Sequence, residues 1–158
     1  MNATKKTILI VEDHKDIRLY LKVLFGNEYN LLMATNGQEG VDMAMKELPD
    51  LIICDVMMPV KDGFDCCREV KECSETCSIP FIMLTAKGDD MDKILGLEYG
   101  ADDYVTKPFN ILEVKARIKA IMRRSSNTMI HPPQHRKTVQ ILSLVICVLM
   151  FRAAACLF

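Results

Sequence analysis

Four apolar runs of the sequence each end in polar residues that could take part in chemistry. Glu12 and Asp13 follow the first run, and Asp55 follows the second. Thr85 follows the third run, and Lys107 closes the fourth, just before a proline. Such groups are costly to bury alone. Together they predict a site for a divalent cation and a phosphoryl group.

The acids suit magnesium, which prefers oxygen ligands in octahedral geometry and keeps several of its waters. Asp13 and Asp55 can each supply a carboxylate oxygen directly, whereas Glu12, longer by one methylene, is better suited to hold a metal-bound water. Three packed acids repel one another, and one proton or one divalent cation relieves that repulsion. The cation would also neutralise charge on an incoming phosphoryl group.

With these ligands in place, Asp55 is the candidate nucleophile and would form an acyl phosphate. Thr85 offers a hydroxyl to one phosphoryl oxygen, and Lys107 offers an ammonium to another. Phosphoryl transfer depends mostly on positioning and charge stabilisation. If the donor is another protein, the chain needs no element of its own to bind a phosphoryl donor.

Each residue also has a structural explanation. Asp55 or Thr85 could cap the helix that follows, Glu12 and Asp13 could be ordinary surface acids, and Lys107 could be a solvated loop lysine. It is the coincidence of all of them at one edge of a sheet that favours a site.

The elements that must position these groups alternate between short apolar runs and amphipathic stretches. The expected strands cover residues 7–11, 31–34, 51–54, 79–84 and 103–106. The expected helices cover residues 15–26, 36–48, 63–73, 89–99 and 111–124. This order predicts an α/β fold, with a five-stranded parallel sheet covered by helices on both faces. Ligands of such sheets bind outside the carboxyl ends of the strands.

Composition narrows the function further. The 20 basic residues nearly balance the 21 acidic ones, so charge gives no case for direct nucleic-acid binding or for a membrane surface. The 7 cysteines are scattered, which favours free thiols over zinc or disulfides. The first residues do not resemble a signal peptide, so we expect the protein in the cytoplasm.

Composition changes after Arg124, which predicts three parts: a domain over 1–124, a linker over 125–138 and an apolar tail over 139–158. A spanning helix needs about 20 apolar residues, and Arg152 would lie inside such a span at a cost. Three explanations of the tail stay open: a membrane anchor, a helix packed in the protein or in a dimer, and a non-native end. An anchored tail would make the chain a membrane-tethered signalling fragment.

Several segments resemble the receiver domain of two-component response regulators, the CheY-like superfamily. They are ILIVED (8–13), DVMMPVKDG (55–63), LTAK (84–87) and GADDYVTKPF (100–109). The resemblance covers about residues 5–124, and within the family this segment is most similar to receivers of OmpR/PhoB-type regulators or of hybrid kinases. It implies a flavodoxin-like sheet with strand order 2-1-3-4-5.

The resemblance also implies roles for the acidic residues. Asp55 is the expected phosphoacceptor, Asp13 a direct Mg²⁺ ligand and Glu12 a supporting one. Asp55 and the main-chain carbonyl of Met57 are expected to complete the protein's ligands to Mg²⁺.

The remaining implied roles concern switching. Thr85 and Tyr104 resemble the switch pair, in which the hydroxyl moves toward the phosphoryl group and the aromatic ring turns inward behind it. Lys107 is expected to pair with the phosphate, and the Lys107–Pro108 bond to be cis.

The implied partners are a sensor histidine kinase and a downstream effector protein or DNA-binding domain. A homodimer through the fourth and fifth helices is also implied, with charged pairs among Lys93, Asp102, Asp103, Glu113 and Arg117. On this reading the chain is not an enzyme and catalyses only its own phosphorylation and dephosphorylation. An aspartyl-phosphate phosphohydrolase is the rival, but such enzymes place a second acid where Met57 stands.

Overall fold

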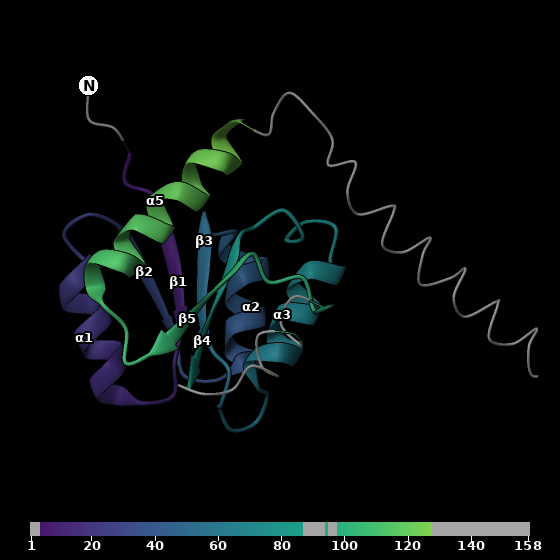
Figure 1. Cartoon of the computed structure of the whole chain (residues 1–158). Helices are drawn as coiled ribbons and strands as arrows, with labels where there is room; N and C mark the ends of the chain where they lie inside the picture. Colours follow the sequence, from purple (N-terminus) through teal and green to yellow (C-terminus); the bar gives the residue numbers. More distant parts are fainter. Residues whose placement is uncertain (1–3, 87–93, 95–97, 128–158) are drawn as a thin grey trace, which may run out of the picture. The chain divides into compact units, whose positions relative to one another are not determined.

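The computed structural model describes residues 4–86, 94 and 98–127 (Figure 1). Within them, one sheet of five parallel strands has the order β2-β1-β3-β4-β5. The strands are β1 (Thr7–Val11), β2 (Asn30–Ala34), β3 (Leu51–Asp55), β4 (Phe81–Ala86) and β5 (Asp103–Lys107). This confirms the predicted fold class and strand order.

Helices cover both faces of the sheet. They are α1 (Lys15–Phe25), α2 (Gly37–Glu47), α3 (Gly63–Glu72) and α5 (Ile111–Asn127). The helix expected over residues 89–99 falls largely outside the described residues. Helices α1 and α5 lie on one face of the sheet, and α2 and α3 lie on the other (Figure 1).

Alternate residues of each central strand belong to different hydrophobic cores, because successive side chains of a strand point to opposite faces. In β1, Leu9 and Val11 pack with α2 and α3, whereas Ile8 and Ile10 pack with α1 and α5. A strand buried on both faces carries an almost unbroken apolar run. That explains why these strands lack the polar alternation of a half-exposed sheet.

Two helices begin where the sequence supplies a side-chain cap. The Asn36 side chain accepts a hydrogen bond from the Glu39 amide, and the Asp62 side chain accepts one from the Asp65 amide. Such caps satisfy main-chain donors that the first helical turn leaves unpaired. Asp62 thereby fixes the start of α3, which follows the loop after Asp55.

Strand β4 differs from its expected bounds at both ends. It begins at Phe81, because Pro80 has no amide to donate to the ladder, although its carbonyl accepts a bond from Ile52. It ends at Ala86, so Thr85 lies inside the strand and not after it. Similarly, Asp55 and Lys107 are the last residues of their strands.

The chain divides into two units, residues 1–125 and 126–158. Helix α5 runs to Asn127, three residues past the boundary expected at Arg124, so the first residues assigned to the linker are helical. Beyond Asn127 nothing is described, and the expected tail lies there. Among the residues that are described, no helix has the length and apolar character needed to cross a membrane.

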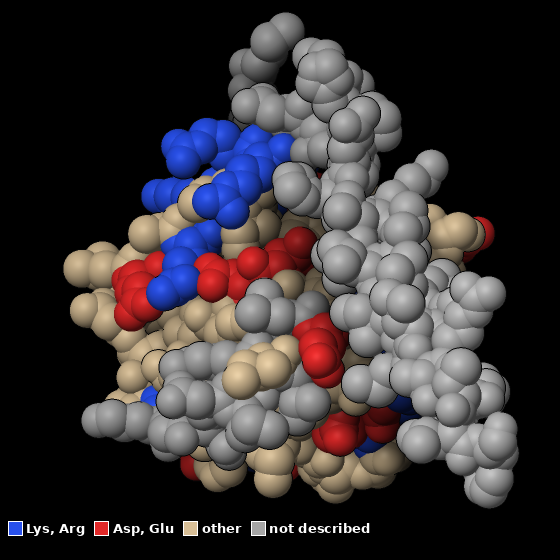
Figure 2. All heavy atoms as spheres, turned by 45° about the vertical axis from the view of Figure 1, so that its right-hand side comes forward, with Lys and Arg blue, Asp and Glu red and all other residues tan. Residues whose placement is uncertain are grey.

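The surface agrees with the balanced composition. On the face that Figure 2 shows, acidic and basic side chains lie in neighbouring groups, in keeping with a net charge of -1. A concentrated cluster of acidic side chains, Glu12, Asp13 and Asp55, lies instead at the carboxyl edge of the sheet.

Candidate functional site

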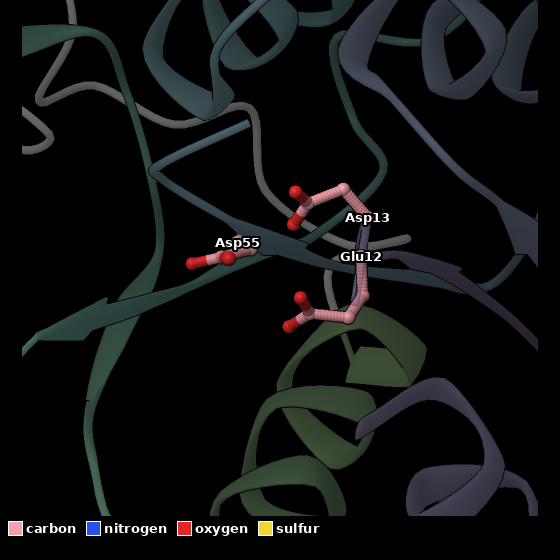
Figure 3. A group of neighbouring side chains, drawn as sticks. All are labelled: Glu12, Asp13 and Asp55. Carbon is pink, nitrogen blue, oxygen red and sulfur yellow. The ribbon is translucent and has the colours of Figure 1, made fainter. Parts of the chain in front are cut away.

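Three acids meet at the carboxyl edge of the sheet. One carboxylate oxygen from each of Glu12, Asp13 and Asp55 lies within 4.8 Å of the others (Figure 3). Glu12 and Asp55 are buried, whereas Asp13 is exposed. The arrangement has the donor set that a hard divalent cation requires.

The register of two neighbouring strands brings these acids together. Val11 of β1 pairs with Cys54 of β3, so the residues that follow, Glu12 and Asp55, lie side by side at the carboxyl edge of the sheet. The Glu12 amide donates to the Ala34 carbonyl and thereby holds this exit against β2.

Lys107 reaches the same site from β5. Its Nζ lies 3.0 Å from Glu12 Oε2 and 3.1 Å from Asp55 Oδ2. The Lys107–Pro108 bond is cis, as the resemblance implied. Three carboxylates facing one ammonium leave a net negative charge when all are ionised, which suits a divalent cation.

Burial and neighbouring charge shift the protonation of this cluster. Burial raises the pKa of Glu12, the charge of Asp55 raises it further, and Lys107 opposes both effects. Burial lowers the pKa of Lys107, but its hydrogen bonds and ion pairs with Glu12 and Asp55 outweigh that and raise the pKa overall. The metal-free cluster therefore holds its negative charge at a free-energy cost that a cation would relieve.

The two residues of the expected switch pair carry buried hydroxyls that bond to nothing described. Thr85 Oγ1 and the Tyr104 hydroxyl are both inaccessible to solvent and lack a hydrogen-bond partner among the described residues. The Tyr104 ring packs against the core between the sheet and α2 and α3, and burial raises its pKa to about 12. Buried hydroxyls usually have a hydrogen-bond partner. Because the Thr85 hydroxyl has none among the described residues, it is available to donate to an incoming oxygen.

Replacing Thr85 with valine should stabilise the unphosphorylated fold by about 1 kcal/mol, because it removes a buried hydroxyl that has no partner. Urea unfolding of the metal-free protein measures this. Thr76→Val is the matched control: Thr76 is also buried, but its Oγ1 donates to the Val70 carbonyl at 2.8 Å. The control should lose about 1 kcal/mol. Equal losses in both variants would contradict the prediction.

Met57 lies two residues past Asp55, in the loop between β3 and α3, with 73% of its surface exposed. The role of its carbonyl as a metal ligand stays a prediction. At the other end of this loop, the Gly63 amide donates to the Val56 carbonyl at 2.9 Å.

Two residues hold the main chain of the site in ways that the sequence analysis did not predict. Arg18 donates to the carbonyls of Glu12 and Asp13, and Gly63 lies against the main chain of Asp55. Both act on backbone atoms, so residue type alone gave no signal for Arg18. The Asp62-Gly63 turn was visible in the sequence, but its packing against Asp55 was not.

The charged residues expected at a dimer interface form ion pairs with one another or with other residues of the same chain. Arg117 lies 2.8 Å from Asp103 and 2.8 Å from Glu113, and Asp102 lies 2.8 Å from Lys71. Lys93 falls outside the described residues. The expected dimer contacts therefore stay a prediction.

A model of the response regulator receiver domain family matches residues 8–119. The chain is 47% identical over 118 residues to histidine kinase P4 of Formosa agariphila, covering 75% of this chain and 9% of the kinase. It is 46% identical over 121 residues to the alkaline phosphatase synthesis transcriptional regulatory protein PhoP of Bacillus subtilis, covering 76% of this chain and 50% of PhoP. The chain thus spans half or less of these relatives.

Solved structures agree. The signal receiver domain of a signal transduction histidine kinase from Syntrophus aciditrophicus superposes with a TM-score of 0.72 and 35% identity, covering 82% of this chain and 98% of that one. The receiver domain of sensor histidine kinase PA1611 from Pseudomonas aeruginosa, solved with a magnesium ion in its active-site cleft, gives a TM-score of 0.71 and 27% identity, covering 75% and 98%. With its fold, its acidic cluster and these relatives, the chain belongs to the response regulator receiver domain family.

Proposed function

We propose that the chain accepts a phosphoryl group on Asp55 from a histidine kinase in a magnesium-dependent reaction, and so acts in a two-component signalling pathway. The observation that carries the proposal is the convergence of Glu12, Asp13 and Asp55 within 4.8 Å, with Lys107 bonded to two of them. The relatives support the donor class, since one of them is itself a histidine kinase.

The transfer moves one phosphoryl group between two protein side chains. A carboxylate oxygen of Asp55 attacks the phosphorus, the phosphorus–nitrogen bond of a phosphohistidine breaks, and the electron pair stays with the imidazole. Lys107 is placed to pair with one phosphoryl oxygen, and the Thr85 hydroxyl to donate to another. Magnesium, when bound, would supply positive charge to the phosphoryl oxygens. The carboxylates of Glu12, Asp13 and Asp55 and the carbonyl of Met57 would hold it.

A protein donor needs an approach to Asp55, and the surface beside Lys107 offers one. An apolar groove runs along the first turns of α1 and the end of β5. Its walls are Asp16, Ile17, Tyr20, Ala86, Lys107, Pro108 and Phe109. Ala86 ends β4 with a small side chain, which leaves room for a bulky donor next to Thr85.

The output of phosphorylation is a changed protein–protein surface. A phosphoryl group adds negative charge and new acceptors, which Thr85 and Lys107 would engage. A movement of the Tyr104 ring behind Thr85 would then alter the surface formed by β5 and α5. That face carries Asp103, Glu113 and Arg117 and is the surface we assign to an effector protein, a DNA-binding domain or a second copy of the chain.

The proposal predicts that Asp55→Asn abolishes phosphorylation while the fold persists. Incubation with a small acyl phosphate and Mg²⁺, followed by intact-mass analysis, should add one phosphoryl group to the unaltered chain and none to the variant. Asp62→Asn is the matched control on the same loop, because asparagine also caps helices, and it should be labelled normally. Labelling of Asp55→Asn at the normal rate would refute the assignment.

A further inference from the structure

The turn between β1 and α1 has to present two consecutive acids to one site. Neighbouring side chains of an extended segment point to opposite faces, yet oxygens of Glu12 and Asp13 both lie within 4.8 Å of an oxygen of Asp55. The main chain must therefore bend at this point. His14, the next residue, has φ of -76° and ψ of 115° and makes no side-chain cap for α1. Its amide instead donates to the Glu12 carboxylate at 3.1 Å.

Arg18 holds the main chain on the other side of this bend. Its Nη1 donates to the Glu12 carbonyl at 2.8 Å and to the Asp13 carbonyl at 2.7 Å. The Arg18 amide itself donates to the His14 carbonyl at 3.0 Å, which places the residue in the first turn of α1. One cation on a helix thus bonds the carbonyls of both residues that carry the acids. Charge-assisted bonds of this kind are stronger than neutral ones.

Arg18 and Lys107 bond to different atoms of the acidic residues. Lys107 bonds to the carboxylates of Glu12 and Asp55 and so competes for the oxygens that a cation would use. The two bonds from Arg18 go to main-chain carbonyls and leave the carboxylate oxygens free. A planar guanidinium directs its hydrogens along fixed lines, whereas a lysine ammonium is a rotating point donor. Arginine is therefore the side chain suited to bridging two adjacent carbonyls.

We propose that Arg18 is a positioning residue for the magnesium site, which fixes the turn at Glu12 and Asp13 so that both carboxylates face Asp55. This proposal rests on the proposed function, because it assumes that the acidic cluster binds a divalent cation. Its effect is preorganisation: a turn that already has its bound conformation does not have to be ordered when the cation arrives.

The test measures the affinity for Mg²⁺ itself, by isothermal titration calorimetry, in the full chain and in Arg18→Met, Arg18→Lys and Arg68→Met. Arg68 is the matched control, since it pairs on the surface with Asp65 at 2.7 Å and lies outside the site. Urea unfolding of each metal-free variant runs in parallel.

Arg18→Met should raise the dissociation constant for Mg²⁺ about tenfold, a loss comparable with that of a hydrogen bond to a charged group. Arg18→Lys should recover part of the affinity, and Arg68→Met should match the unaltered chain. A purely structural role would shift unfolding in Arg18→Met and leave the dissociation constant unchanged, and that result would overturn the proposal. If the unaltered chain binds no Mg²⁺ and takes no phosphoryl group, the proposed function fails first.

Discussion

Replacing Lys107 with methionine should destabilise the metal-free fold by about 3 kcal/mol at neutral pH, because it leaves buried charge without its partner. Glu12 is fully buried, and Lys107 is its ion-pair partner at 3.0 Å. Asp55, also buried, loses the same ammonium. Methionine keeps an unbranched apolar stem and lacks only the terminal ammonium position of lysine, so packing changes little and the loss of stability measures the loss of the charge. Urea unfolding measures it.

The loss should depend on pH in a direction that the buried acid dictates. Burial already raises the pKa of Glu12 above its ordinary 4.5, and loss of Lys107 raises it further. The folded variant therefore holds a proton that the unfolded chain releases, so its stability falls as pH rises from about 4.5 through the raised pKa. Below that window the penalty disappears, because both states are protonated. Lys107 in the unaltered chain stays charged throughout this range, since its own pKa is raised.

Two comparisons separate charge from shape at position 107. Lys107→Arg keeps the positive charge and should lose much less stability than Lys107→Met at pH 7. Saturating Mg²⁺ should restore part of the stability of Lys107→Met, because a ligand that binds only the folded state stabilises it by mass action. If Lys107→Met is equally stable at pH 5 and pH 7, with and without Mg²⁺, the charges of Glu12 and Asp55 do not depend on Lys107.

The acids were predictable from sequence because each stands where an apolar run stops. Glu12 and Asp55 follow runs that are buried on both faces, and parallel strands bring their carboxyl ends to one edge. The same reasoning placed Lys107, which closes β5. The apolar runs did not predict the start of β4 correctly, because Pro80 is as apolar as its neighbours but has no amide to donate to the hydrogen-bond ladder of the sheet.

The hydrogen bonds that hold the main chain around the site could not be predicted from the sequence, for a different reason. Lys71 donates to the Ile79 carbonyl at 2.7 Å and pairs with Asp102, and the pattern of side chains does not reveal a partner on the main chain. Arg18 is a similar case, since its acceptors are the carbonyls of Glu12 and Asp13. Residue types indicate which groups can react, whereas contacts between distant main-chain atoms decide how those groups are held.

Gly63 is the position where that main-chain packing is tightest. A Cβ added there would lie 2.2 Å from the Asp55 carbonyl oxygen and 2.9 Å from the Val56 Cα. These are backbone atoms of the last residue of β3 and of the residue after it, and they cannot turn aside as a flexible side chain could. The closeness lets the Gly63 amide reach the Val56 carbonyl and places the start of α3 directly behind Asp55, the proposed phosphoacceptor.

Gly63→Ala should therefore destabilise the fold by about 3 kcal/mol through overpacking, despite the better helix propensity of alanine. In the molecules that do fold, either α3 or the end of β3 has to move, and a displacement of Asp55 of about 1 Å can cost on the order of 100-fold in rate. Labelling by an acyl phosphate, measured at a temperature where urea unfolding shows the variant folded, separates the two effects.

Gly100→Ala is the control for this substitution. Gly100 has φ of 88°, and among the described residues a Cβ there would meet only the Lys71 side chain, no closer than 3.5 Å. Alanine at that angle should cost about 1 kcal/mol in backbone strain, with phosphorylation unchanged because the position lies away from Asp55. Should Gly63→Ala label as fast as Gly100→Ala, the contact between α3 and β3 would not govern the placement of Asp55.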